Sequence, residues 1–95
     1  MRALIDLLSG ETRRREILLR AEFQQLSTLI INECAIAKAN GRSFKYKADD
    51  DVLSIEFILN SKIFLRKYYQ CELSHQRMRH FIKWLKHLNF LGEAA

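Results

Sequence analysis

Proline is absent from this 95-residue sequence, which contains only three glycines and two cysteines. Proline and glycine interrupt regular secondary structure, so their scarcity predicts long helices and strands joined by short loops. Two cysteines, Cys34 and Cys71, can form at most one disulfide, which excludes the disulfide-rich class of small secreted domains. We therefore expect a protein of a reducing compartment, with the cytoplasm as the default.

Long hydrophobic runs are missing as well. The apolar start of the chain is interrupted by Asp6 and is too short for a signal peptide. No stretch approaches the roughly 18 apolar residues of a membrane-spanning helix. With 48% hydrophobic and 28% charged residues, the composition is typical of a folded globular protein without a membrane segment.

The length of the chain allows one domain, residues 1–95. A domain of this size buries only about 60–65% of the surface that its unfolded chain exposes, so its stability alone is marginal. Because disulfides are poor candidates for additional stabilisation, we expect a homodimer.

Acidic residues are scarce in the last third of the chain. Residues 62–95 contain seven basic side chains and two acidic ones, whereas residues 49–61 contain four acidic ones and no basic one. Residues 1–48 are basic again, and the net charge of the whole chain is +5. This distribution predicts a polyanionic partner, most often nucleic acid.

Two helices are predicted before residue 41. Residues 2–9 form a short helix that ends at Gly10, and residues 11–40 form a long one that ends at Asn40-Gly41. Apolar side chains recur along the long helix at steps of three and four, and three more widen this stripe: Leu19, Phe23, Leu26, Ile30, Cys34 and Ala37, then Leu18, Leu29 and Ile36. We expect this helix to be central to the fold or to form the dimer interface.

Residues 43–72 show the alternation of a three-stranded antiparallel meander. Turns are expected at Asp49–Asp51 and at Asn60-Ser61. In an alternative interpretation, residues 51–59 and 62–70 are helices, and the domain is mostly α, of the helix-turn-helix or winged-helix kind.

The last predicted element is a basic amphipathic helix over residues 74–89. Ser74 is its expected N-cap, and it closes near Asn89, after which Phe90 and Leu91 fold back onto the core. The fold class expected is therefore α+β: a long N-terminal helix, a three-stranded antiparallel meander and a C-terminal basic helix.

A hydrophobic residue, Leu73, precedes the polar Ser74, and the apolar Met78 and Phe81 follow four and seven positions after it. In this pattern residues 73–88 are similar to the recognition helices of winged-helix regulators. The order helix, three strands, helix resembles, in topology alone, some double-stranded-RNA-binding domains. Each resemblance implies contact with a nucleic acid.

The candidate functional residues are mostly cations of the C-terminal helix, which has no acidic residue between Ser74 and Asn89 to neutralise them. We expect them to contact phosphates, with one or two residues near the start of the helix reading bases. Further candidates are cations interleaved with aromatic residues in the meander and the arginines that begin the long helix. The predicted nucleic-acid-binding residues are His75, Gln76, Arg77, Arg79, Lys83, Lys86, Arg66, Lys45, Lys47, Arg13 and Arg14.

Catalytic and metal sites are not expected. Cys71 and His75 stand four residues apart at the start of a helix, without further ligands at a usable spacing. The sequence contains neither a glycine-rich phosphate loop nor a nucleophile elbow, so we assign no catalytic residue, metal or cofactor. The function expected is that of a DNA-binding regulatory or accessory factor, with DNA favoured over RNA. The alternative is a protein-interaction module, such as a chaperone, inhibitor or adaptor, whose apolar long helix packs on another protein.

Overall fold

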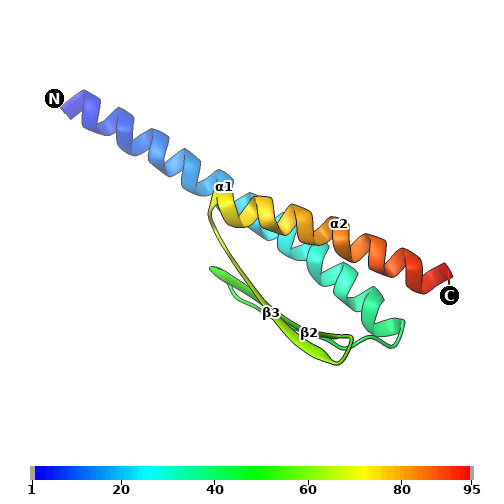
Figure 1. The fold of residues 1–95 in the computed structure, drawn as a ribbon. Helices are drawn as coiled ribbons and strands as arrows, with labels where there is room; N and C mark the ends of the chain where they lie inside the picture. The colour runs from blue at the N-terminus through cyan, green and yellow to red at the C-terminus, as the bar shows by residue number, and fades with distance from the viewer. Residues whose placement is uncertain (1, 95) are drawn as a thin grey trace.

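The computed structural model describes the backbone of residues 2–94 and the side chains of residues 13–91. The elements follow the order α1 (Arg2–Ala39), β1 (Phe44–Ala48), β2 (Val52–Leu59), β3 (Lys62–Tyr69) and α2 (Glu72–Ala94) (Figure 1). The α+β fold and its meander are thereby confirmed. The mostly helical alternative is wrong, because alternate residues of β2 point into the core and a helix could not bury that pattern.

Helix α1 is a single element of 38 residues, so the predicted break at Gly10 is wrong. A glycine inside a helix costs only about 1 kcal/mol relative to alanine, and its neighbours Leu7, Leu8 and Glu11 are good helix formers. At about 1.5 Å per residue, α1 spans roughly 57 Å. Its N-terminal part extends beyond both α2 and the sheet (Figure 1).

The end of α1 is confirmed at Asn40-Gly41. Gly41 has a φ of 85°, which places it in the left-handed region that favours glycine. Its N–H donates to the carbonyl of Lys38 at 3.0 Å, and the N–H of Arg42 donates to the carbonyl of Ala37 at 3.0 Å. These two bonds form a Schellman motif, which satisfies the last carbonyls of the helix and turns the chain into β1.

The sheet is antiparallel in the order β1-β2-β3, with both turns where they were expected. Asn60 and Ser61 have φ values of 53° and 65°, the mark of a type I′ turn, whose twist suits two paired strands. At the other turn, a carboxylate oxygen of Asp49 accepts from the N–H groups of Asp51 and Val52 at 2.8 and 2.7 Å. These bonds lower the pKa of Asp49 and hold the acidic turn in place.

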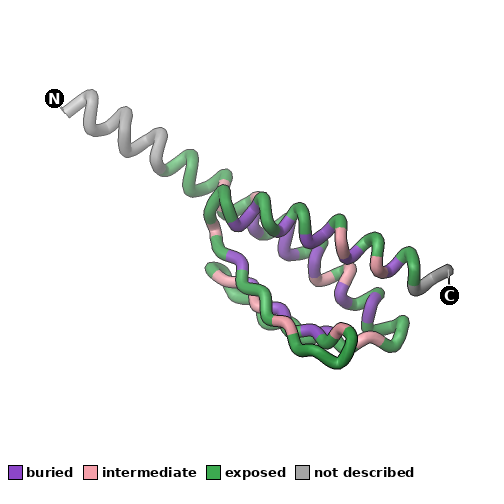
Figure 2. Tube along the Cα trace, viewed as in Figure 1, coloured by how far each residue is buried: buried purple, intermediate pink, exposed green. Residues whose placement is uncertain are grey.

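Both helices cover the same face of the sheet and run in the same direction (Figure 1). Helix α1 lies over β1, and α2 lies over β3. The buried residues of the helices and strands alternate with exposed ones (Figure 2), and the strand residues that point away from the helices, such as Lys45, Ile58 and Leu65, are exposed, so that face of the sheet is bare. The core contains the expected stripe of α1 apart from the half-buried Leu19, five residues of the strands (Phe44, Leu53, Ile55, Phe57 and Tyr68), and Met78, Phe81, Ile82 and Leu85 of α2.

The apolar stripe of α1 is therefore covered within one chain, by α2 and the sheet. The residues that widen the stripe remain exposed, so a homodimer through α1 would have to use Leu18, Leu29 and Ile36. Within the described part of the chain, neither helix is long and apolar enough to cross a membrane.

Helix α2 starts earlier and ends later than predicted. Cys71 stands at the N-cap, since its carbonyl accepts from the N–H of His75 at 2.9 Å, and Ser74 is buried inside the first turn. Asn89 does not end the helix: its buried amide donates to the backbone carbonyl of Glu33 at 2.9 Å and to the Glu33 carboxylate at 2.8 Å. The helix continues through Phe90 and Leu91, which are exposed and do not fold back onto the core.

Replacing Leu85 by alanine tests the position of the core. Leu85 is fully buried, so Leu85→Ala is expected to lower the free energy of unfolding by about 2–5 kcal/mol through lost burial and the cavity left behind. Leu73→Ala, an exposed position on the same helix, is expected to change it by less than about 0.5 kcal/mol. Urea denaturation followed by circular dichroism measures both, and equal losses would contradict the placement of α2.

Candidate nucleic-acid interface

The predicted nucleic-acid-binding residues do not form one site. Gln76, Arg77, Arg79, Lys83 and Lys86 lie on α2 and are exposed. Lys45 and Lys47 lie on the bare face of the sheet, which is turned away from both helices. The exposed Arg13 and Arg14 belong to α1, and Arg66 lies between β3 and α2, so the structure distributes these cations over several surfaces.

The exposed cations Arg79, Lys83 and Lys86 are here named the α2 cationic face, whereas Arg77 lies on another side of the helix, toward β3. Positions 79, 83 and 86 follow at steps of four and three, which places them on one side of the helix over about 10 Å of its length. Neither Lys83 nor Lys86 has a carboxylate within ion-pair distance among the described residues. These two ammonium groups are therefore available to a phosphate.

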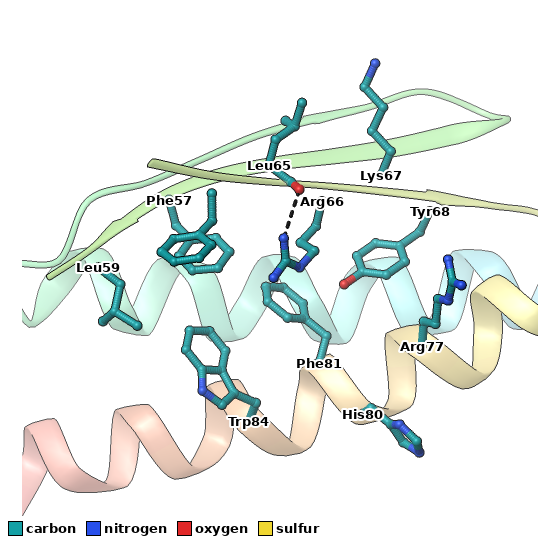
Figure 3. A pocket seen from close by; sticks show the side chains of 11 residues that line it. Phe57, Leu59, Leu65, Arg66, Lys67, Tyr68, Arg77, His80, Phe81 and Trp84 are labelled. Carbon is teal, nitrogen blue, oxygen red and sulfur yellow. Dashed lines mark hydrogen bonds between the residues drawn. The ribbon is translucent and has the colours of Figure 1, made fainter. Parts of the chain in front are cut away.

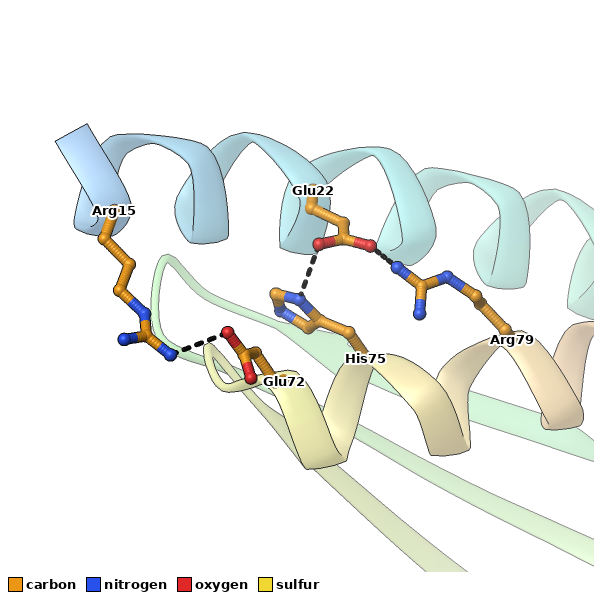
Figure 4. A network of polar contacts seen from close by, with 5 residues as sticks. All are labelled: Arg15, Glu22, Glu72, His75 and Arg79. Atoms are coloured by element: carbon orange, nitrogen blue, oxygen red, sulfur yellow. Dashed lines mark hydrogen bonds and ion pairs between the residues drawn. The ribbon is translucent and has the colours of Figure 1, made fainter.

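Arg79 is the member of this face that is already paired. Its guanidinium contacts the carboxylate of Glu22 on α1, and the other oxygen of that carboxylate lies 3.1 Å from Nδ1 of His75 (Figure 4). One turn closer to the start of α2, Glu72 pairs with Arg15 at 2.7 Å. These ion pairs join the two helices, so Arg79 contributes less free charge than its exposure suggests.

His75 cannot read a base, contrary to the prediction, because its side chain is only 1% exposed and packs in the interior. We assign its proton to Nδ1, which then donates to Glu22, while Nε2 is buried without a partner. Burial lowers the pKa of His75, since a second proton would place an unsatisfied N–H in the core. Its role is to join α2 to α1.

The aromatic residues that alternate with cations in the meander pack in different ways. Phe44 is buried and stacks on Phe57, with their ring centroids 5.2 Å apart, so it offers no face to a base. Tyr68 is buried too, and burial raises its pKa to about 12. Tyr46 and Tyr69 remain about half exposed, on opposite faces of the sheet.

A groove of about 700 Å³ between β3 and α2 was not foreseen from the sequence (Figure 3). Aromatic rings line one part of it and cations line another, and no acidic residue takes part. The residues that define this β3–α2 groove are Phe64, Arg66, Tyr68, Arg77, Phe81 and Trp84. The only sign of this groove in the sequence was the alternation of cations and aromatic residues in β3. Its other wall comes from α2, and only the tertiary packing brings α2 next to β3.

The guanidinium of Arg66 crosses this groove. Its central carbon lies 5.9 Å from the ring centroid of Phe57 and 5.7 Å from that of Phe64, within the range of cation–π attraction. One of its nitrogens donates to the backbone carbonyl of Leu65 at 3.1 Å. Arg66 is thus exposed, held by weak contacts and free of any carboxylate among the described residues.

Comparison of the chain with protein-family models, curated proteins and solved structures found no match. Among the residues that the structure describes, no three histidine, cysteine or acidic side chains gather as metal ligands would. The cationic and apolar surfaces of the chain are therefore the features that point to a function.

Mild acid is expected to destabilise the fold through His75. Because its pKa in the folded state lies below the ordinary value of 6.5, the unfolded chain binds more protons, and the free energy of unfolding falls as the pH drops through about 6.5. His75→Gln keeps an N–H donor for Glu22 but cannot titrate, so its stability should change less between pH 7.5 and about 5. Urea denaturation across this range measures the slope of the unfolding free energy against pH, and the exposed His87→Gln is the control. Equal slopes in His75→Gln and wild type would show that the buried His75 is not the group that titrates.

The two thiols are expected to react at very different rates. Hydrogen bonds from the Ser74 hydroxyl and backbone N–H lower the pKa of the exposed Cys71, while burial raises that of Cys34 to about 11. A thiol-specific chromogenic disulfide reagent should titrate one thiol of the native protein quickly and the second only after denaturation. Cys71→Ser should remove the fast phase, and two fast equivalents in the native protein would contradict the structure.

Proposed function

We propose that the protein binds nucleic acid through the α2 cationic face and acts as a regulatory or accessory factor. The observation that carries this proposal is that α2 exposes Lys83 and Lys86, beside the paired Arg79, on a helix with no acidic residue between Leu73 and Leu91. A helix that only needs to be soluble mixes both signs of charge along its exposed side. A one-sign surface of this kind suits a row of phosphates.

DNA is the preferred form of nucleic acid in this proposal. The major groove of B-form DNA is about 12 Å wide and admits an α-helix, whereas that of an RNA duplex is too narrow for side chains to read. Gln76 is exposed near the start of α2 and is the candidate for a base contact. Affinity from a few phosphate contacts alone lies at the weak end of non-specific binding, with a Kd of about 10⁻⁴ to 10⁻⁶ M.

Two further parts of the proposal concern location and assembly. Cys34 and Cys71 are both free thiols, as expected of a protein kept in the reducing cytoplasm. A homodimer would use the exposed Leu18, Leu29 and Ile36 of α1 and would double the number of cations available to one duplex.

The second candidate function is that of a protein-interaction module. It is favoured by the bare face of the sheet, where Ile58, Ile63 and Leu65 are exposed next to one another on β2 and β3. Exposed apolar patches of this kind are typical of surfaces that contact other proteins.

Removing two cations of α2 tests the first proposal. Lys83→Ala with Lys86→Ala should weaken binding to all duplex sequences alike, and should flatten the slope of log K against log salt by about 1.8, at roughly 0.9 per lost phosphate contact. Fluorescence anisotropy with labelled duplex DNA, duplex RNA and single strands over a salt series measures this slope. Light scattering gives the mass of the complex-forming species.

The matched control is Lys45→Ala with Lys47→Ala, which removes the same charge from the bare face of the sheet. It should leave the slope as in wild type. The proposal is overturned if the folded protein binds no nucleic acid near 0.1 M salt, or if the sheet variant and the helix variant lose the same slope.

A further inference from the structure

The outer edge of β3 has unpaired backbone groups. The N–H of Ile58 donates to Ser43 at 3.2 Å, and Val52 accepts from the N–H of Asp49 at 3.1 Å, so the even-numbered residues of β2 bond to the β1 side. The odd-numbered ones must then bond to β3, where their partners are the even-numbered residues. The backbone groups of three residues are left facing the open edge: Ile63, Leu65 and Lys67.

This open edge borders the β3–α2 groove. A strand added along β3 would direct every second side chain toward the helices and into the groove, with about 6.8 Å between successive ones. In the groove, Leu59 and Trp84 form an apolar end and Arg77 lies at the opposite end, with Arg66 between them above Phe81 (Figure 3). The lining therefore suits an apolar side chain and a carboxylate placed two residues apart on the same face of a strand.

We propose that the β3–α2 groove binds an extended acidic segment of a partner protein, which adds to β3 as a fourth strand. An apolar side chain of the segment packs on Phe64 and Trp84, and a carboxylate two residues away pairs with Arg66 and Arg77. This inference does not rest on nucleic-acid binding, because Lys83 and Lys86 do not line the groove.

Arg66 links the binding of the carboxylate in the groove to the backbone pairing along the edge of β3. In the free protein its guanidinium donates a hydrogen bond to the Leu65 carbonyl, which is one of the acceptors on the open edge. A carboxylate offers Arg66 a stronger, charge-assisted partner. Its movement onto the ligand releases the Leu65 carbonyl to accept a hydrogen bond from the added strand.

A second copy of the chain fits this edge less well. Lys62, Arg66 and Lys67 give β3 three positive charges and no negative one, so pairing two β3 strands would place like charges against each other.

Nucleic acid fits the groove less well for a different reason. Of its rings, Phe57, Tyr68 and Phe81 are only 3, 4 and 8% exposed and offer no open face for base stacking, which leaves only the partly buried Phe64 and Trp84. The open backbone edge has no counterpart in a nucleic acid, whereas a peptide matches it with its own N–H and C=O groups.

The single tryptophan of the chain, Trp84, lies in the groove and reports on it directly. The probe is a synthetic peptide as long as β3, in which every second position carries leucine and glutamate in turn and the positions between carry threonine, so that both types reach one face only. Titration should shift the Trp84 emission and saturate. A peptide with lysine in place of the acidic residues should leave the emission unchanged.

Backbone methylation separates strand addition from simple charge attraction. Two versions of the probe carry N-methyl groups on alternate amides, one on the odd and one on the even positions. Only one set faces β3, so one version should lose binding by at least about tenfold while the other keeps it. Equal affinities for the two versions would overturn the proposal.

Charge variants complete the test. Arg66→Gln with Arg77→Gln should weaken binding of the probe by at least about tenfold, whereas Arg20→Gln with Lys38→Gln, two exposed cations of α1, should not. Circular dichroism confirms that each variant is folded. If a single-stranded oligonucleotide shifts the Trp84 emission and the peptide does not, the groove is part of a nucleic-acid surface and the peptide proposal fails, whatever the result for Lys83 and Lys86.

Discussion

The packing of aromatic rings around Phe57 is the interaction on which the arrangement of the whole molecule depends. Phe57 lies in the middle strand, and its ring centroid is 5.2 Å from those of Phe44 on β1 and Phe64 on β3. The rings of Phe81 and Trp84 reach it from α2, at 5.8 and 5.3 Å. One side chain thus contacts all three strands and the second helix, so the position of α2 on the sheet is set by ring packing.

This position determines which surfaces remain free. A three-stranded sheet covered on one face has an opposite face and two edges without partners, and such edges are templates for pairing with another chain. Here the edge of β3 is protected by cations, of which Arg66 also occupies a backbone carbonyl. The same cations that discourage pairing between copies of the chain select for a partner of opposite charge.

The elements of the fold could be predicted because their signals are local. The alternation in β2, the turn at Asn60-Ser61 and the glycine after α1 each describe a few neighbouring residues, and all three are confirmed. The predicted break at Gly10 failed for a local reason, because its neighbours favour helix, whereas the predicted end of α2 failed where a distant contact outweighs a local preference. Asn89 resembles a helix stop, but its amide bonds to Glu33 from within α2, 56 positions along the chain.

For the candidate binding surfaces, too, the features set by neighbouring residues could be predicted and those set by distant contacts could not. The one-sign character of α2 is visible in the sequence, and its cations are indeed exposed. The burial of His75 and the pairing of Arg79 depend on Glu22, which lies on another helix. The β3–α2 groove needs two elements to lie at a certain separation, and no pattern of neighbouring residues encodes that separation.

The position of α2 after the sheet in the chain has a consequence for the order of folding. Helix α2 follows the sheet in the chain, so α1 and all three strands leave the ribosome before it does. Until then the inner face of the sheet, including Phe57, lacks the cover that Phe81 and Trp84 provide. The hairpins can form early because their contacts are local, but the core closes only once α2 has emerged, and until then the aromatic face of the nascent chain is open to chaperones.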